Sequence, residues 1–403
     1  RTLIFYTDVD RLERHLIKFS PADEKPIKEF IEGIRICIPV EIPSKHDSPV
    51  QRLNKLLSIA STFLMNGRKM KKWMKITAED FSKNFSDKTL AQAFREMWVP
   101  EFSMFFMLFT FAYLHKKNAG YPIGGSKPMS QALETRYKDL GGTIMYNRKV
   151  SKIIIENGKA RGIRLQDSSE FFADRVISAA DGHTTIFEML GNRFGDESTL
   201  KPYEKWPVFP PLVYVSLGVN RTFDDEPKTV SGITFRLKEP VIICNKKREW
   251  LSVHVYNMDK TMAPEGKTAI TLMLKTDYDY WKSLDHRQYR IMKEEIATQI
   301  IEQLEQRFPG IKGQIEVIDV ATPLTFERYT GNWKGSFEGW LITPENSNVL
   351  IKPMSQTIPD LGNFYMCGQW VQPGGGLPTS IMSGKRLIRK ICKEDGRKFR
   401  TDN

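Results

Sequence analysis

Residues 363–384 read NFYMCGQWVQPGGGLPTSIMSG, and the interpretation of the whole chain depends on this stretch. The pattern predicts a short buried strand at Phe364–Cys367, a glycine-dense turn at Gly374–Gly376 and a helix that begins near Pro378. Adjacent glycines allow positive φ and a close approach of the backbone to a ligand. Free N–H groups at a helix start favour an electron-rich or anionic partner. The stretch also fits an ordinary strand–loop–helix connection, because it contains neither GxGxxG nor the P-loop spacing.

The composition is that of a globular protein large enough for two domains. The chain has 403 residues, and its 60 Lys and Arg against 48 Asp and Glu give a net charge of +12. This charge favours anionic surfaces and phosphate-bearing cofactors. The basic clusters Lys69–Lys72 and Lys385–Lys393 are each more typical of a solvated face. No zinc-finger spacing, RNA-binding aromatic signature or basic helical repeat occurs, which argues against a nucleic-acid partner.

Cysteine and histidine usage argues against a disulfide scaffold and against a metal site. The four cysteines are far apart without a CxxC pair, and the six histidines form no HExxH motif. A reducing compartment fits best, so we expect a cytoplasmic protein, with peripheral membrane association as an option. No signal or targeting segment is recognisable. The apolar run Met104–Leu114 is too short to span a bilayer and fits a buried helix or an interfacial segment.

The first 119 residues predict mostly helices. A strand is expected at residues 1–8, a helix that begins near Ser20, and an amphipathic helix over 51–66. Two shorter helices are expected over 77–84 and 87–98.

After Gly120 the pattern changes towards strands. A helix over 128–140 should stop at Gly141, and strands are expected at 143–146 and 150–155. The pair Asn157-Gly158 is a strong signal for a two-residue hairpin turn.

The centre of the chain predicts a buried strand, an all-β segment and a long helix. The uncharged run Val176–Ala180 suits a strand that is buried on both faces, and Asp181 follows at the end where ligands gather in open α/β sheets. Residues 206–280 read as several strands, and 285–308 as one long helix.

Three blocks, in the same order along the chain, resemble the carotenoid (phytoene) desaturase and retinol saturase family. The first runs from Tyr121–Ser126 through the Asn157-Gly158 hairpin to Val176–Asp181; the others are Thr322–Asn332 and Tyr365–Gly384. The resemblance implies an α/β fold, in which an FAD/NAD(P)-binding Rossmann-like domain is joined to an α+β substrate domain. It also implies that FAD is the cofactor.

The resemblance further implies a discontinuous domain organisation. The FAD-binding domain would comprise residues 1–8, 120–200 and 320–403, and the substrate domain residues 9–119 and 201–319. The residues implied to bind the cofactor are Val150 near the adenine, Ala180 and Asp181 near the adenosine and pyrophosphate, and Gly368, Gln369, Gly375, Gly376, Leu377 and Pro378 near the flavin ring. No side chain stands out as a catalytic acid or base.

One departure from the family is serious, because the GxGxxG fingerprint that follows the first strand is absent. A missing βαβ unit would comprise at least ~30 residues. We therefore expect a fragment that begins after that unit, binds FAD poorly and leaves an open sheet edge and apolar surface uncovered.

The activity implied by the resemblance is hydride transfer between the flavin and a C–C bond of an apolar polyene or isoprenoid. The run 102–114 and the aromatics Trp333, Phe337 and Trp340 could line a tunnel for such a substrate, although for any single one of these residues core packing is the simpler explanation. The basic surface together with this run suggests peripheral membrane docking. The alternatives are an amine-oxidase-type flavoenzyme, with Trp370 as one aromatic wall, and a truncated non-catalytic flavoprotein.

Overall fold

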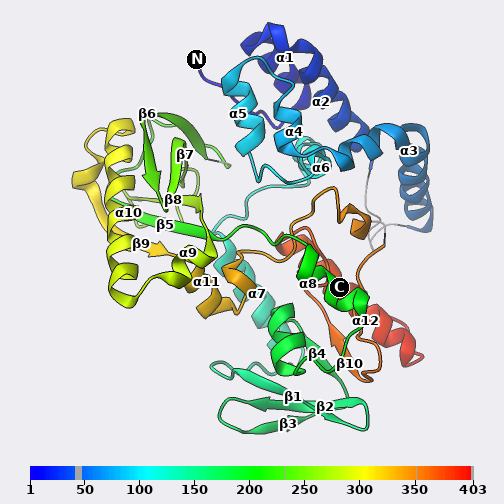
Figure 1. The fold of residues 1–403 in the computed structure, drawn as a ribbon. Coiled ribbons are helices and arrows are strands. Elements are labelled where there is room, and N and C mark those ends of the chain that lie inside the picture. The colour runs from blue at the N-terminus through cyan, green and yellow to red at the C-terminus, as the bar shows by residue number, and fades with distance from the viewer. Residues whose placement is uncertain (41–47, 231, 351, 401–403) are drawn as a thin grey trace. The chain divides into compact units, whose positions relative to one another are not determined.

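The computed structural model describes residues 1–40, 48–230, 232–350 and 352–400. It divides into two compact units, which are both drawn in Figure 1. Unit 1 comprises residues 1–120 and 342–353, and unit 2 comprises residues 121–341 and 354–403. This division rests on compactness, so the functional domain boundaries expected from the sequence remain a prediction.

Unit 1 is a helical unit around one apolar core. Its helices are α1 (Val9–Phe19), α2 (Glu24–Cys37), α3 (Pro49–Lys75), α4 (Ala78–Ser82), α5 (Lys88–Glu96) and α6 (Met104–His115). Leu12, Ile31, Phe94 and Leu108 are fully buried in this core. The helices expected from the periodicity are present, and α3 continues nine residues beyond the expected end at residue 66.

The strand expected at residues 1–8 is wrong. Residues 1–6 have no regular secondary structure, and Asp8 begins α1 as its N-cap by accepting from the Arg11 N–H at 2.8 Å. The backbone N–H of Ile4 donates to His15 Nε2 at 3.0 Å instead of to a neighbouring strand. Side-chain acceptors therefore take the hydrogen bonds of these backbone N–H groups, whereas the apolar residues alone suggested pairing in a sheet.

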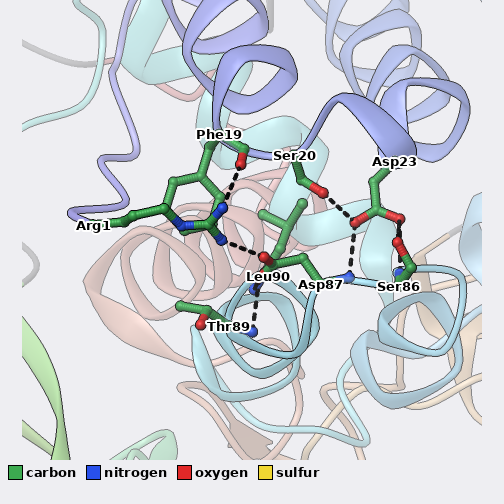
Figure 2. A network of polar contacts seen from close by, with 8 residues as sticks. All are labelled: Arg1, Phe19, Ser20, Asp23, Ser86, Asp87, Thr89 and Leu90. Atoms are coloured by element: carbon green, nitrogen blue, oxygen red, sulfur yellow. Dashed lines mark hydrogen bonds and ion pairs between the residues drawn. The ribbon is translucent and has the colours of Figure 1, made fainter.

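A buried carboxylate at Asp23 connects the turn after α1 to the segment before α5 (Figure 2). It accepts hydrogen bonds from the Ser20 hydroxyl at 2.7 Å, from the Ser86 N–H and hydroxyl, both at 2.7 Å, and from the Asp87 N–H at 3.0 Å. Asp87 in turn caps α5 and pairs with Arg1. Burial raises the pKa of Asp23, but these hydrogen bonds outweigh it and hold the pKa below its usual value.

The aromatic run that corresponds to α6 is a buried helix, one of the two options left by its length. Met104, Met107, Leu108, Phe111 and Ala112 are buried in the core of unit 1. A Cβ on Gly33 of α2 would meet the Leu108 side chain at 2.9 Å, so α2 and α6 pack closely. The other apolar side chains of this run, Phe105, Phe106, Phe109, Tyr113 and Leu114, are only half-buried, and the expectation that the run docks on a membrane stays a prediction.

Unit 2 contains a five-stranded antiparallel sheet in the order β6-β7-β8-β5-β9. The strands are β5 (Leu212–Val219), β6 (Ile233–Ile243), β7 (Lys246–Val255), β8 (Thr268–Lys275) and β9 (Ile315–Ala321). The helix α10 (His286–Arg307) packs on this sheet through Ile296, Ile300 and Leu304 (Figure 1). This arrangement confirms the all-β segment and the long helix that the sequence predicts. Unit 2 also has three shorter helices: α8 (Glu197–Lys205) before β5, α9 (Tyr278–Ser283) between β8 and α10, and α11 (Pro323–Thr330) after β9.

A three-stranded antiparallel sheet lies after α7 (Ser126–Asp139) and consists of β1 (Val150–Glu156), β2 (Lys159–Leu165) and β3 (Glu170–Phe172). The hairpin turn is confirmed, since Asn157 and Gly158 both have positive φ, 49° and 71°. The strand expected at residues 143–146 is wrong, because these residues pair with no strand of the described chain. An alternating apolar pattern favours a strand but does not show whether another strand is available to pair with it.

The decisive stretch of the sequence forms β10 (Phe364–Met366), a turn, and α12 (Gly376–Glu394). β10 pairs in parallel with β4 (Val176–Ser178), with Phe364 opposite Val176 and Met366 opposite Ser178. Two segments that are far apart in sequence thus place their carboxyl ends at the same sheet edge. This edge is where ligands bind in open parallel α/β sheets.

Candidate functional site

The candidate site begins where β4 and β10 end together. The Cys367 N–H donates to the Ser178 carbonyl at 2.9 Å, which extends the pairing by one residue. The next N–H, that of Gly368, donates to the Ser383 hydroxyl of α12 at 3.0 Å. The strand end, the turn and the helix are therefore held together by hydrogen bonds within the chain.

The turn before α12 depends on glycine at three consecutive positions. Gly374, Gly375 and Gly376 all have positive φ, of 115°, 70° and 78°. The N-cap of α12 is Gly375, and no side chain of that residue can satisfy the N–H groups of the first turn. Leu377, just inside the helix, is 48% exposed. The start of α12 is thus an accessible, positively polarised end of a 19-residue helix.

Glu338 brings a carboxylate to this helix start. A Cβ added to Gly375 would overlap Glu338 Oε2, and the Glu338 carboxylate accepts from the Gly376 N–H. Burial raises the pKa of Glu338 to about 7, although the Gly376 hydrogen bond opposes the shift. A carboxyl group that titrates near neutral pH is a candidate for proton transfer. Glu338 is not among the site residues predicted from the sequence, where its one signal is that it is a lone acid within the aromatic and glycine-rich run 336–340.

Asp181 lies at the end of β4 and is only 3% exposed. Its Oδ1 accepts from the Thr184 N–H at 2.7 Å, and its Oδ2 accepts from the Trp333 N–H at 2.9 Å. Burial raises the pKa of Asp181, while these two backbone donors oppose that shift. Both oxygens are therefore used to hold the loop around Trp333 against the end of β4.

Aromatic rings pack around this loop. The rings of His183 and Trp333 stack at 4.8 Å with an interplanar angle of 8°, and Trp340 lies 5.1 Å from Trp370. Tyr203 and Trp370 are nearly parallel at 6.4 Å, but Trp370 is only 2% exposed. The cluster is a packed aromatic wall, and its buried rings do not present an open cage.

The other residues that the sequence singled out lie at two places. Gln369 lies between β10 and the glycine turn and donates from Nε2 to Asn332 Oδ1 at 3.1 Å, so it links the third block of the sequence to the second. Val150 lies apart, at the start of β1, where an open apolar cavity of about 250 Å³ is lined by Met145, Arg148, Val150, Ile163, Leu165 and Phe171. The remaining predicted residues lie at the end of β4 (Ala180) and at the start of α12 (Pro378).

The described residues contain neither a metal-binding cluster nor a membrane-spanning helix. No group of three or more His, Cys, Asp or Glu side chains among them could hold a metal ion. None of the helices in the described ranges is long and apolar enough to cross a membrane.

Comparison with known sequences identifies one family and several relatives. The family of flavin-containing amine oxidoreductases matches residues 41–391. The chloroplastic prolycopene isomerase of Arabidopsis thaliana is 28% identical over 291 residues, which cover 70% of this chain and 47% of that protein. The neurosporene-forming phytoene desaturase of Rhodobacter capsulatus is 25% identical over 407 residues, which cover 96% of this chain and 75% of that protein. The chain thus spans about half the length of the prolycopene isomerases that it matches.

Solved structures of the same fold include an oxidoreductase from Methanosarcina mazei and a putrescine oxidase variant. The first has a TM-score of 0.51 at 19% identity and covers 88% of this chain and 74% of its own. The second has a TM-score of 0.56 at 12% identity and covers 92% and 76%. At these identities the likeness establishes the fold alone, and it confirms the fold class that the sequence predicts.

Proposed function

The chain belongs to the flavin-containing amine oxidoreductase family, and on this premise we propose that it forms part of an FAD-dependent oxidoreductase acting on C–C bonds of an apolar polyene or isoprenoid. The observation that carries the proposal is the accessible start of α12, at the common end of two parallel strands, with its triple-glycine turn. The named relatives, phytoene desaturases and prolycopene isomerases, support the substrate class.

The described residues fit the flavin end of the cofactor and do not fit its pyrophosphate end. Glu338 occupies the space beside Gly375, but Gly376 is open, so a planar ring would approach the backbone there. The polarised start of α12 would favour negative charge on that ring. FAD, when bound, supplies the hydride acceptor and donor of the reaction. No GxGxxG loop is present to hold a pyrophosphate, so this chain offers the closing half of a cofactor site.

We assign the residues around this site by position. Gly375, Gly376, Leu377 and Pro378 would lie against the flavin ring, and Gly368 and Gln369 would shape the strand end beside it. Ala180 and Asp181 would lie towards the adenosine, with Asp181 holding the Trp333 loop in place. Val150 would face the adenine from the apolar cavity at the start of β1.

The chain's own side chains would orient the substrate, exclude water and hold a proton. The aromatic wall around Trp333 and Trp340 would exclude water next to the site. Glu338 is placed to hold a proton at the start of α12. A polyene substrate partitions into membranes, so we include peripheral association of a cytoplasmic protein with a membrane surface in the proposal.

The amine-oxidase alternative is weaker on geometry. Such a reaction pairs the flavin with an open aromatic cage, and Trp370, the wall considered from the sequence, is packed against Trp340. The putrescine oxidase likeness supports the fold and not the substrate.

The test joins a GxGxxG-bearing βαβ unit ahead of residue 1, supplies excess FAD and offers the purified protein polyenes or amines. Chromatography would detect a desaturated, saturated or isomerised polyene, and peroxide release would detect amine oxidation. We expect turnover with the polyene alone. Amine turnover would contradict the proposed substrate class. FAD binding without turnover of either substrate would favour the non-catalytic alternative.

A further inference from the structure

The helix α3 of unit 1 carries a surface that the proposed function does not use. Its first half and its middle expose apolar side chains to an unusual degree: Leu57 is 56% exposed, Met65 75% and Leu64 88%. Val50 and Leu53 are exposed as well. Single exposed apolar residues are common, but several on consecutive turns of one helix indicate an interaction surface. In Figure 1, α3 extends beyond the other helices of unit 1.

The same helix is strongly basic. Its 27 residues include seven Lys and Arg and no Asp or Glu. Lys69 pairs with Glu32 of α2 at 2.5 Å, and Lys72 pairs with Glu29. Arg68, Lys71 and Lys75 are exposed and make no ion pair with any residue that the structure describes.

Helical spacing places the exposed apolar side chains and the cations that are unpaired in the described structure on one side of α3. At about 3.6 residues per turn, Val50, Leu53, Leu57 and Leu64 lie on the same side as Arg68, Lys71 and Lys75. The opposite side is the packed one, where Thr62, Met70 and Trp73 are buried. The exposed stripe is therefore apolar from Val50 to Leu64 and cationic over the last two turns.

We propose that α3 docks unit 1 on an anionic lipid membrane, with its apolar side chains among the acyl chains and its cations at the lipid phosphates. A basic helix with an apolar face lies in the membrane interface, and anionic lipids attract its Lys and Arg. The proposal assigns docking to α3, whose apolar side chains are exposed, and not to the aromatic run of α6, whose side chains are buried or half-buried.

Charge decides against pairing of α3 with a second copy. A parallel pair would place Arg68, Lys71 and Lys75 opposite the same cations, and an antiparallel pair would place them opposite leucines. A lipid surface accommodates both halves of the stripe, because acyl chains and phosphates lie next to each other there. The proposal deepens the membrane association given above and requires neither flavin nor turnover.

The experiment measures co-sedimentation of the 403-residue protein with vesicles. One set contains phosphatidylcholine with about 30% phosphatidylglycerol, and the other contains phosphatidylcholine alone. Binding is compared at about 50 mM and about 500 mM salt, where the screening length changes severalfold. We expect binding to the anionic vesicles that weakens with salt, and little binding to the neutral ones.

Two variants separate the contribution of the apolar side chains to membrane binding from that of the cations. Leu57→Ser with Leu64→Ser should lower the partition coefficient at least about tenfold at both salt concentrations, through lost apolar insertion. Arg68→Gln with Lys71→Gln and Lys75→Gln should lower it about tenfold or more at low salt only. The matched control, Arg14→Gln with Lys18→Gln and Lys25→Gln, removes three exposed cations elsewhere in unit 1 and should bind like the parent.

Three outcomes would overturn the proposal. They are no binding to anionic vesicles at low salt, equal loss in the control and in the α3 cation variant, and a dimer in lipid-free light scattering that the leucine variant dissociates. Circular dichroism of each variant shows whether it is folded, so a loss of binding is not mistaken for unfolding. Since no flavin or substrate is used, these outcomes are independent of the proposed activity.

Discussion

Glu338 and Gly375 lie so close together that any side chain at position 375 would overlap the Glu338 carboxylate. The backbone of Gly375, at φ 70° and ψ 169°, also lies in a region that is essentially restricted to glycine. The start of α12 therefore depends on glycine for its conformation and for the room that the carboxylate occupies.

Gly375→Ala should destabilise the fold through both effects. Backbone strain costs about 1–3 kcal/mol, and displacing the carboxylate adds about 1–3 kcal/mol. Urea unfolding would measure the change. Gly125→Ala is the matched control, because Gly125 is also a helix N-cap with positive φ, but its nearest neighbour is the flexible Met262 side chain at 3.3 Å. Equal losses in the two variants would show that Glu338 does not constrain position 375.

Glu338 should make stability depend on pH. Because folding raises its pKa from the usual 4.5 to about 7, the protonated form stabilises the fold. This contribution is fully present below about pH 4.5 and is lost as the pH rises through 7, by at most about 3 kcal/mol. Glu338→Gln should be less sensitive to pH between 5 and 8 in denaturant unfolding. The pKa of Asp181 is also raised by burial, so its contribution has the same sign and persists in the variant. An unchanged slope in the variant would refute this role.

Asp23→Asn should weaken unit 1. The amide cannot accept all the hydrogen bonds from Ser20, Ser86 and Asp87, and losing charge-assisted bonds costs about 2–3 kcal/mol. Because folding lowers the pKa of Asp23, the ionised carboxylate stabilises the fold. This stabilisation is present above the unfolded-state pKa and is lost as the pH falls through the folded-state pKa. The variant should therefore lose part of the parent's acid sensitivity in thermal unfolding. Asp10→Asn, at an exposed ion pair with Arg35, should change little.

The purified 403-residue chain should contain little flavin. None of its glycines forms the GxGxxG loop that holds a pyrophosphate, so the site at α12 has no partner for that part of FAD. The absorbance near 450 nm, relative to that of the protein, measures occupancy directly. Near-full occupancy without added cofactor would show that the described half-site suffices.

Some elements of the fold were predictable from the sequence and others were not. The Asn157-Gly158 hairpin, the capped helix α10 and the strand–turn–helix at residues 363–384 were predictable, because turn chemistry, caps and periodicity act between near neighbours. The strands expected at residues 1–8 and 143–146 do not form, since a strand also needs a pairing partner that an apolar pattern does not supply.

The sequence by itself therefore determined the local elements and, through three blocks in order, the family. Only the tertiary structure decided that Phe364–Met366 pairs with Val176–Ser178, that Glu338 lies at the start of α12, and that α6 is buried while α3 exposes its leucines. Each of these depends on contacts between segments that are distant along the chain. Neighbouring residues in the sequence do not show which distant segment will pack against a side chain. That packing sets the burial of the side chain, its pKa and whether it can contact a ligand.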